Sequence, residues 1–318
     1  MALAATGGSV SKERPRERRF VFKYQAKVPA EDGGVHLWVP IPHDDPYQKI
    51  SKLQVESSLP YSVETDALGN RILSVEGKPG GVAPSVTLRF ECVRQEHIQA
   101  LAAQHHVPQL TAEERRHWLA PDRLVPLDPK IQQWAHEVVD AAGAKTDLAM
   151  ARAIYNHVVA TVKYDKTGKG WGRGDIYYAC DARRGNCTDF HAIFIGYARA
   201  MGIPARFSIG FPIPTEHGAG TIAGYHCWAE FYAKGIGWVP VDASEAAKDP
   251  KRREYFFGAH DENRVEFTRG RDLRLKPQQA GQPLNYFIYP YAEAGGKPVE
   301  NVAHVFTWKD ETGHAQAF

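Results

Sequence analysis

Long apolar segments are absent from this sequence. No stretch approaches the roughly 20 consecutive apolar residues that a transmembrane helix needs, so we predict no membrane span. Residues 1–11 also lack the apolar segment of a secretory signal peptide. If the short run at residues 2–5 is what remains of a removed leader, a periplasmic or secreted location is favoured. Without such a leader, the expected location is the cytoplasm.

Cysteine is scarce, and neither sign of charge dominates. The 318 residues include four cysteines, which is too few for a disulfide scaffold. A bridge between Cys180 and Cys187 stays open as an alternative to free thiols. The 39 basic residues nearly balance 37 acidic residues, for a net charge of +2, which does not indicate nucleic-acid binding. The arginines of residues 14–19 are interrupted by glutamates, and we expect them in a solvated tail.

Sequence motifs for common ligands are also missing. The glycines of residues 168–174 lack the G-x-x-x-x-G-K-[ST] order of a phosphate-binding loop. No segment has the D-x-[DN]-x-[DN]-G pattern of a calcium loop. The histidines between residues 105 and 157 lack metal-ligand spacing. We therefore expect neither a cofactor nor a metal.

The residues that are present predict a globular protein with two domains. Hydrophobic residues make up 43% of the chain and charged residues 24%. We expect a disordered tail over residues 1–18 and a β-sandwich domain over residues 19–95, because short alternating runs are separated by glycine-rich turns. Pro40 and Pro42 predict that the strand containing them lies at a sheet edge. The strand-like runs of this domain cover residues 20–25, 35–39, 54–56, 61–64, 71–75 and 86–92.

Residues 96–318 are expected to mix helices and strands. Apolar spacing predicts helices between residues 96 and 162, with a capped start at Thr111. Residues 164–184 are expected to form an irregular loop that serves as a wall or lid of a cleft. A strand is expected at residues 206–211 and a hairpin at residues 225–242. Three further runs after residue 254 are expected to join the sheet of that hairpin.

Cys187 is the residue around which the functional prediction is built. Gly185 and Asn186 favour a turn, and the apolar residues after them recur at helical spacing up to Gly202 and Pro204, which predict the helix end. The thiol is therefore expected in the first helical turn, where the helix dipole and free N–H groups stabilise a thiolate. The N–H of Cys187 itself is a candidate donor to an oxyanion. The alternative is a small, buried hydrophobic residue.

The hairpin predicts a partner for this thiol. If the hairpin closes on residues 233–235, Tyr232 faces Ile236, and His226 lies directly opposite Asp242. Directly opposed residues have Cβ atoms about 4.5–5.5 Å apart. The carboxylate would then hold one imidazole nitrogen and leave the other free, as a catalytic histidine requires. The alternative is a cross-strand pair that only stabilises the sheet.

Four segments in this order resemble the transglutaminase-like superfamily, including its bacterial members. The family pattern is a Gly-x-Cys helix start, a Gly-Ile-Pro-Ala-Arg turn, a His-x-Trp-x-Glu strand and a Gly-Trp-x-x-x-Asp strand. The matching segments span residues 184–242 and read Arg184-Gly185-Asn186-Cys187-Thr188-Asp189, Ala198-Arg199-Ala200-Met201-Gly202-Ile203-Pro204-Ala205-Arg206, Tyr225-His226-Cys227-Trp228-Ala229-Glu230 and Gly237-Trp238-Val239-Pro240-Val241-Asp242.

The resemblance implies a papain-like core in which the cysteine helix packs on an antiparallel sheet. The predicted fold class is therefore α+β, with the β-sandwich domain first and a transglutaminase-like catalytic domain over residues 96–318. The resemblance also implies that Cys187 is the nucleophile, that His226 is the base and acid, and that Asp242 orients the histidine.

Four further residues are candidates for support of this triad. Eukaryotic transglutaminases use a tryptophan near the cysteine to stabilise the oxyanion, and Trp171 is near in sequence, although its spacing does not transfer that role. Asp189 and Tyr225 are neighbours of the triad residues, with packing as the alternative. Trp228 is expected to exclude water from the site.

The expected reaction is thiol-dependent acyl transfer on the amide or peptide bond of a peptide or protein, through a thioester. Hydrolysis is favoured over transfer to an amine, which would make the protein a transglutaminase. A catalytically inactive binding module on the same fold is an alternative of another class. A further alternative is a metal-binding module, but the spacing of the cysteines and histidines that would bind the metal does not resemble a C-x₂-C site. Those donors would be Cys180, Cys187, His191, His226 and Cys227. The sequence does not predict the oligomeric state.

Overall fold

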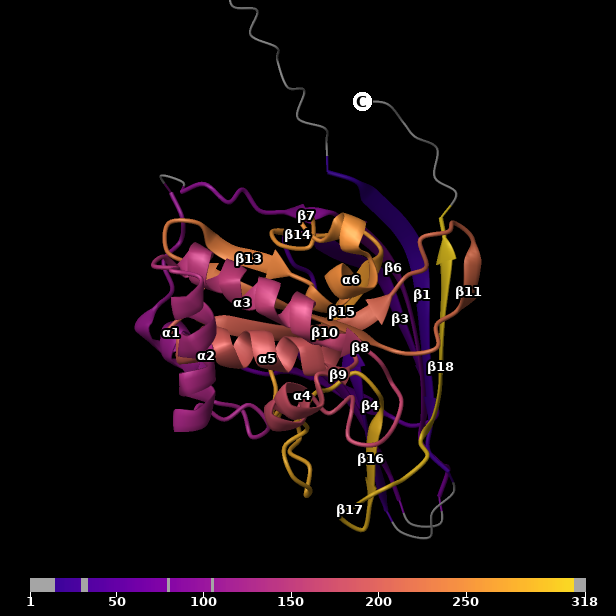
Figure 1. The fold of residues 1–318 in the computed structure, drawn as a ribbon. Helices are drawn as coiled ribbons and strands as arrows, with labels where there is room; N and C mark the ends of the chain where they lie inside the picture. Colours follow the sequence, from indigo (N-terminus) through magenta and orange to yellow (C-terminus); the bar gives the residue numbers. More distant parts are fainter. Residues whose placement is uncertain (1–14, 30–33, 79–80, 104–105, 312–318) are drawn as a thin grey trace, which may run out of the picture.

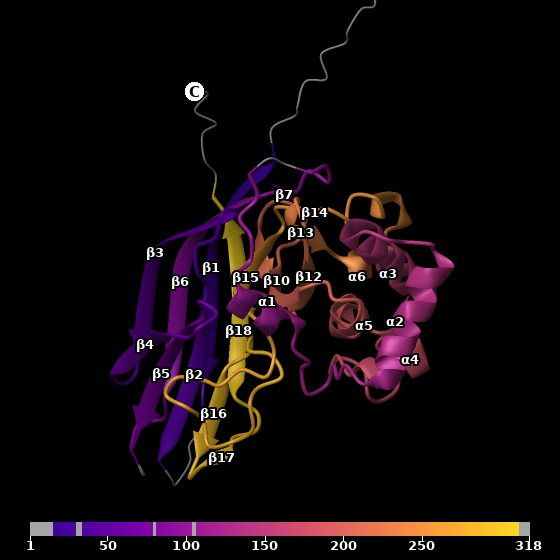
Figure 2. The same cartoon turned by 90° about the vertical axis from the view of Figure 1, so that its left-hand side faces the viewer.

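The computed structural model describes residues 15–29, 34–78, 81–103 and 106–311. Residues 1–14 of the predicted tail lie outside this range. Figures 1 and 2 show a sheet-rich region on one side, helices on the other, and a smaller sheet between them. The predicted α+β class is therefore confirmed.

The sheet-rich region contains two antiparallel sheets of five strands each, in the orders β11-β18-β1-β6-β3 and β17-β16-β2-β5-β4. Residues of both sheets, such as Phe22, Leu88 and Leu73, belong to one hydrophobic cluster. The strands are β1 (Glu17–Lys27), β2 (Val35–Ile41), β3 (Gln48–Ser57), β4 (Tyr61–Thr65), β5 (Arg71–Gly77), β6 (Ser85–Gln95), β11 (Ala219–Thr221), β16 (Tyr291–Ala294), β17 (Lys297–Pro298) and β18 (Ala303–Asp310). Alternating burial along β1 and β6 is the pattern that predicted them.

The end of the chain completes these two sheets. β18 pairs with β1, and β16 pairs with β2. Of the three late runs, only residues 264–269 join the hairpin sheet, so the expectation that all three would do so is wrong for the other two. Alternation within a run predicts a strand, but it carries no information about which distant strand becomes its neighbour. The division into domains at residues 95 and 96 stays a prediction.

The predicted edge position of the strand with Pro40 is also wrong. β2 lies between β16 and β5, inside its sheet. Its pairing with β16 extends only from Val35 to Trp38, whereas its pairing with β5 runs on to Ile41. Pro40 therefore lies beyond the end of the β16 ladder, where its missing N–H breaks no pairing with that strand.

The smaller sheet has the order β13-β12-β10-β15, and we call it the core sheet. Its strands are β10 (Ala205–Pro212), β12 (His226–Ala233), β13 (Gly237–Val241) and β15 (Arg264–Arg269). Phe22 of β1 packs on Phe211 and Phe267, with ring centroids 5.3 and 5.7 Å away, and so joins the sheet-rich region to one face of the core sheet. Short ladders pair β7 (His97–Ile98) with β14 (Ala259–His260), and β8 (Lys163–Tyr164) with β9 (Arg184–Gly185).

The other face of the core sheet is covered by α5 (Cys187–Ala200). Phe194 of this helix lies 6.0 Å from Phe231 of β12, measured between ring centroids. The remaining helices are α1 (Ala112–Leu119), α2 (Pro129–Ala141), α3 (Asp147–Thr161), α4 (Ile176–Ala182), α6 (Ala243–Lys248) and the 3₁₀ turn η1 (Pro250–Arg252). The capping box at Thr111 is confirmed. The irregular loop predicted for residues 164–184 is wrong in part, because Asp175 caps the two-turn helix α4 within it.

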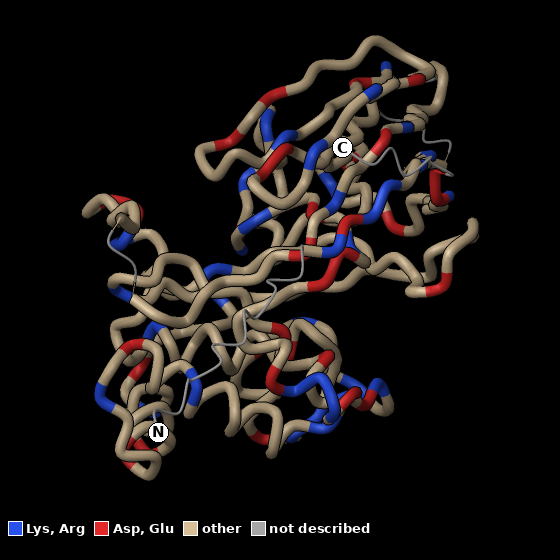
Figure 3. The backbone as a smooth tube through the Cα atoms, turned by 90° about the horizontal axis from the view of Figure 1, so that it is seen from above, with Lys and Arg blue, Asp and Glu red and all other residues tan. Residues whose placement is uncertain are grey.

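Charges of both signs are intermingled along the chain (Figure 3). The expectation that the arginines of residues 14–19 are solvated is wrong for Arg18. This residue lies in β1 with a buried side chain, and its guanidinium binds the Asp310 carboxylate at 2.9 Å and lies 5.0 Å from the Trp308 ring. A charged run next to a strand can therefore be structural when its partners come from the far end of the chain.

The contribution of β18 to the fold can be tested with two adjacent residues. Phe306 is buried against Phe211, with ring centroids 4.3 Å apart, whereas Val305 on the other face is 48% exposed. We expect Phe306→Ala to lower the free energy of unfolding by about 3–5 kcal/mol and Val305→Ala to change it by about 0.5 kcal/mol or less. Urea unfolding followed by fluorescence measures both. Equal effects would show that β18 does not dock as described.

Candidate active site

The start of α5 places the thiol as the sequence predicted. Asn186 is the N-cap, and its side-chain oxygen accepts a hydrogen bond from the Thr188 N–H at 3.0 Å. The Asp189 carboxylate in turn accepts from the Asn186 N–H at 2.9 Å, which completes a capping box. Cys187 is the first residue of the helix, where backbone N–H groups lack helical partners.

The hairpin brings His226 and Asp242 together, but not in the predicted register. β12 pairs with β13 so that Ala229 faces Val241 and Ala233 faces Gly237. The turn therefore lies one residue later than predicted, which shifts each pairing by two residues. The direct opposition of His226 and Asp242 is wrong. Asp242 instead follows the last residue of β13 and caps helix α6. A pairing shift of two residues keeps each side chain on the predicted face of the sheet. The two side chains therefore still meet, and Nε2 of His226 lies 2.7 Å from Oδ2 of Asp242.

The Asp242 carboxylate is fully buried and receives four hydrogen bonds. Oδ1 accepts from the Ser244 hydroxyl at 3.0 Å and from the Glu245 N–H at 3.1 Å. Oδ2 accepts from His226 and from the Arg264 guanidinium, the latter at 3.2 Å. Arg264 is itself buried at the start of β15 and lies 4.9 Å from the Trp228 ring. Residues of β12, α6 and β15 thus all donate hydrogen bonds to this carboxylate.

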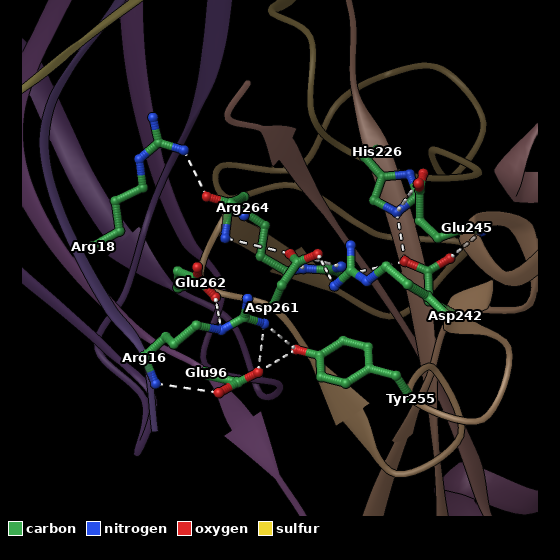
Figure 4. A network of polar contacts seen from close by, with 12 residues as sticks. Arg16, Arg18, Glu96, His226, Asp242, Glu245, Tyr255, Asp261, Glu262 and Arg264 are labelled. Carbon is green, nitrogen blue, oxygen red and sulfur yellow. Dashed lines mark hydrogen bonds and ion pairs between the residues drawn. The ribbon is translucent and has the colours of Figure 1, made fainter. Parts of the chain in front are cut away.

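Figure 4 shows that the contacts of Arg264 continue away from the site. Its guanidinium also binds Asp261, 3.2 Å away, and Asp261 binds Arg252 at 3.1 Å. Asn263 in the same segment accepts a hydrogen bond from Arg18 of β1 at 2.6 Å. The segment before β15 is therefore tied both to the catalytic candidates and to the sheet-rich region.

The charges of the three candidates stabilise one another. Burial opposes ionisation of Cys187, but hydrogen bonds from Cys227 and His226 and the imidazolium charge outweigh it and lower the pKa of the thiol well below 9.0. Burial also opposes protonation of His226, yet Asp242 and the thiolate raise the pKa of its imidazole to about 10. The pKa of Asp242 is lowered against the effect of burial by His226 and Arg264. At neutral pH these shifts favour a thiolate and an imidazolium.

Two buried residues beside the candidate triad, His191 and Arg264, were not predicted to support it, although His191 was named as a donor of the alternative metal site. His191, one turn after Cys187, accepts a hydrogen bond from the Ala243 N–H through Nε2 at 3.2 Å. Its Nδ1 lies 3.6 Å from the Cys227 sulfur. His191 therefore links the helix that carries the thiol to the helix start at Asp242. The position of His191 one helical turn after Cys187 could have indicated that its side chain lies near the thiol. No feature of the sequence indicates that Arg264 binds Asp242.

The predicted supporting residues occupy different positions. Asp189 accepts hydrogen bonds from the N–H groups of Gly172 and Gly174 at 2.7 and 3.0 Å, so it anchors the glycine-rich loop on α5. Trp171, which precedes Gly172, is half-buried, and its role as an oxyanion donor stays a prediction. The hydroxyl of Tyr225 accepts from the Asn186 side chain at 2.9 Å.

Trp228 is buried on the core sheet, with its ring centroid 5.9 Å from that of His226.

The four cysteines are free thiols. Cys180 lies in α4 against the Tyr197 hydroxyl, 3.5 Å away, and so belongs to different surroundings from the triad. Within the described ranges, no group of three or more acidic, histidine or cysteine side chains is arranged to hold a metal ion.

A cleft opens beside the imidazole of His226. It has a volume of about 410 Å³ and is lined by Tyr164, Tyr225, Glu245 and Lys248 among others. Cys187 is not among the lining residues and is 2% exposed. The cleft is large enough for a peptide side chain or a small ligand. In the part of the chain that the structure describes, no helix is long and apolar enough to cross a membrane.

Ionisation of the thiol predicts how Cys187 reacts with iodoacetamide. Because only the thiolate reacts and the pKa of Cys187 is lowered, we expect alkylation to stay fast from pH 8.5 down to pH values where an ordinary thiol has lost reactivity. Mass spectrometry of the modified peptide gives the rate at each pH. His226→Asn should remove the imidazolium and make the rate fall about tenfold for each pH unit below 9. The same steep fall in the unmodified protein would contradict the ion pair.

Comparisons with known proteins support the fold. Residues 132–243 match the Transglutaminase-like superfamily. An uncharacterized protein of Haemophilus influenzae is 28% identical over 323 residues, which cover 89% of this chain and 87% of that protein. The crystal structure of a candidate cysteine protease from Cytophaga hutchinsonii has a TM-score of 0.62 at 14% identity and covers 93% of this chain and 98% of its own.

A more distant likeness is to the periplasmic domain of TgpA from Pseudomonas aeruginosa, with a TM-score of 0.38 at 16% identity over 77% of this chain and 92% of that one. The predicted resemblance is confirmed by the family match and by the fold shared with the Cytophaga protein. Residues 132–243 of this chain are therefore similar to the transglutaminase-like superfamily.

Proposed function

We propose that this protein is a cysteine hydrolase that cleaves an amide or peptide bond through a thioester on Cys187. The observation that carries the proposal is the contact of Nε2 of His226 with the Asp242 carboxylate at 2.7 Å. The same imidazole lowers the pKa of the Cys187 thiol at the start of α5. Such a relay supplies a nucleophile, a proton carrier and a group that orients it. The family match supports the same reaction class.

The first half of the reaction forms the thioester. The Cys187 thiolate attacks the carbonyl carbon of the substrate, and a C–S bond forms while the carbonyl oxygen becomes an oxyanion. The backbone N–H of Cys187, at the first position of α5, is our candidate donor to this oxyanion. The imidazolium of His226 gives its proton to the leaving nitrogen as the C–N bond breaks. Because Nε2 is held by Asp242, this proton comes from Nδ1.

The second half releases the product. Neutral His226 takes a proton from water, the hydroxide attacks the thioester carbon, and the C–S bond breaks to give a carboxylic acid and the Cys187 thiolate. Asp242 stays ionised throughout, because Arg264 offsets its charge without depending on the proton of the imidazole. Attack by an amine in place of water would give the transglutaminase reaction from the same thioester.

Replacement of the nucleophile tests the proposal directly. We expect Cys187→Ala to lower cleavage of a responsive peptide-amide substrate by a factor of about 10³ or more, with an unchanged circular-dichroism spectrum. Cys180→Ala is the matched control, because Cys180 is a second free thiol outside the triad. It should keep full activity. Cleavage by the Cys187→Ala protein at the rate of the unmodified protein would refute the mechanism and favour an inactive binding module.

The acyl acceptor can be read from the products. With a peptide-amide library in water, we expect mass spectra to show acids that are about 1 Da heavier than the starting amides. An excess of a primary amine should leave these acids as the main product if hydrolysis dominates. Amine adducts as the main product would instead assign the protein as a transglutaminase. The Cys187→Ala protein provides the background for both measurements.

A further inference from the structure

A second cavity lies on the face of the core sheet that turns away from Cys187. Its volume is about 500 Å³, within the usual range of small-molecule sites. We call it the far-face cavity. It is lined by parts of β6, β7, β10, β12, β13, β14 and β15, together with the segments at residues 45–47 and 106–110.

The alternation of side chains along β12 turns one set of residues away from helix α5 and toward this cavity. Cys227 contacts His191 of α5, and Phe231 packs on Phe194 of the same helix. Trp228, Glu230 and Tyr232 therefore point to the opposite face, and all three line the far-face cavity. Cys187 is not among the residues that line this cavity.

The buried carboxylates of the cavity already have cationic partners. Glu230 binds Arg206 at 2.6 Å, and Glu266 binds Arg269 at 2.6 Å. The guanidinium of Arg206 also lies 4.1 Å from the ring of Trp238, which is part of the wall. These pairs supply a polar and partly aromatic lining without a large excess of either charge.

Arg94 differs from the other arginines of the lining. Its side chain is 2% exposed, yet Nε and one terminal nitrogen have no hydrogen-bond partner among the described residues. The nearest carboxylate oxygen, on Asp45, is 3.6 Å away, which is too far for a hydrogen bond, and it also lies 3.5 Å from Arg269. A guanidinium carries five N–H donors, and leaving such donors unmet in a buried place is costly. An acceptor-rich anion would meet them.

A free acceptor faces the same space. Burial lowers the pKa of His260, so the ring is neutral and one of its nitrogens carries a lone pair. Its Nε2 is buried without a partner, which leaves a lone pair for an N–H or O–H donor. The polar groups that need partners thus include a cation with several donors and a neutral acceptor, and Nε2 of His97 is another buried atom of the lining without a partner.

We propose that the far-face cavity binds a small carboxylic acid that also carries an N–H donor and an apolar body, as an N-acylated amino acid does. The carboxylate binds the guanidinium of Arg94, the N–H binds Nε2 of His260, and the apolar body packs on Trp228, Tyr232 and Trp238. Planar guanidinium groups bind carboxylates through paired, charge-assisted hydrogen bonds. The inference does not rest on the proposed function, because no group of the triad takes part.

Calorimetric titration with N-acetylphenylalanine tests this site. The titration uses the Cys187→Ala protein, so that no turnover interferes, and N-acetylphenylalaninamide is the matched probe without a carboxylate. We expect saturable binding of the acid and binding of the amide that is weaker by about tenfold or more, as the loss of a charge-assisted contact implies. Arg94→Gln should weaken binding of the acid by a similar factor, whereas the control Arg89→Gln, on the exposed face of β6, should leave it unchanged.

A crystal structure of the Cys187→Ala protein soaked with N-acetylphenylalanine decides the position even if Arg94→Gln fails to fold. Density for the acid against Arg94 and His260 would support the site. Density elsewhere, equal binding of acid and amide, or the absence of binding would overturn it. Because none of these measurements reads peptide cleavage, their failure is distinguishable from failure of the proposed function.

Discussion

Burial of the Asp242 carboxylate is the constraint on which the candidate active site depends. An ionised group without access to water costs several kcal/mol unless donors compensate it. Here four donors do so, from His226, Arg264, Ser244 and the backbone of Glu245. Since β12, β15 and α6 each contribute, the carboxylate can stay ionised only when all three elements are in place. Formation of the charged site and docking of these elements are therefore one event.

Arg264 links this event to the rest of the molecule. Its second partner, Asp261, belongs to the segment that Arg18 of β1 also holds through Asn263. Figure 4 shows these contacts running between the imidazole and the first strand of the chain. The sheet-rich region thus fixes the segment from which the buried guanidinium reaches Asp242. This is a physical reason for the two regions to occur in one chain, beyond any part that the sheets take in substrate binding.

The sequence predicted what depends on local spacing and missed what depends on distant pairing. The helix start at Cys187 follows from turn residues and apolar periodicity, and it was found at the right residue. The hairpin was found with its turn one residue too early and its pairing shifted by two residues, because symmetry of a hairpin does not fix its register. His226 and Asp242 still meet, because a pairing shift of two residues leaves each side chain on the predicted face of the sheet. Arg264 was seen only as part of a strand, since nothing near it in sequence reveals that β15 lies beside β10.

The glycine of the Gly-x-Cys start shows how one carboxylate can position both the candidate nucleophile and the glycine-rich loop. A Cβ at Gly185 would lie 2.1 Å from Oδ2 of Asp189, so any other residue there would displace this carboxylate. The same oxygen accepts from the Asn186 N–H at the helix start and from the Gly172 N–H in the glycine-rich loop. Displacing it would free the loop and uncap the helix together. Glycine is therefore needed at this position because the helix start with the thiol and the glycine-rich loop share one anchor, not because the thiol itself needs room.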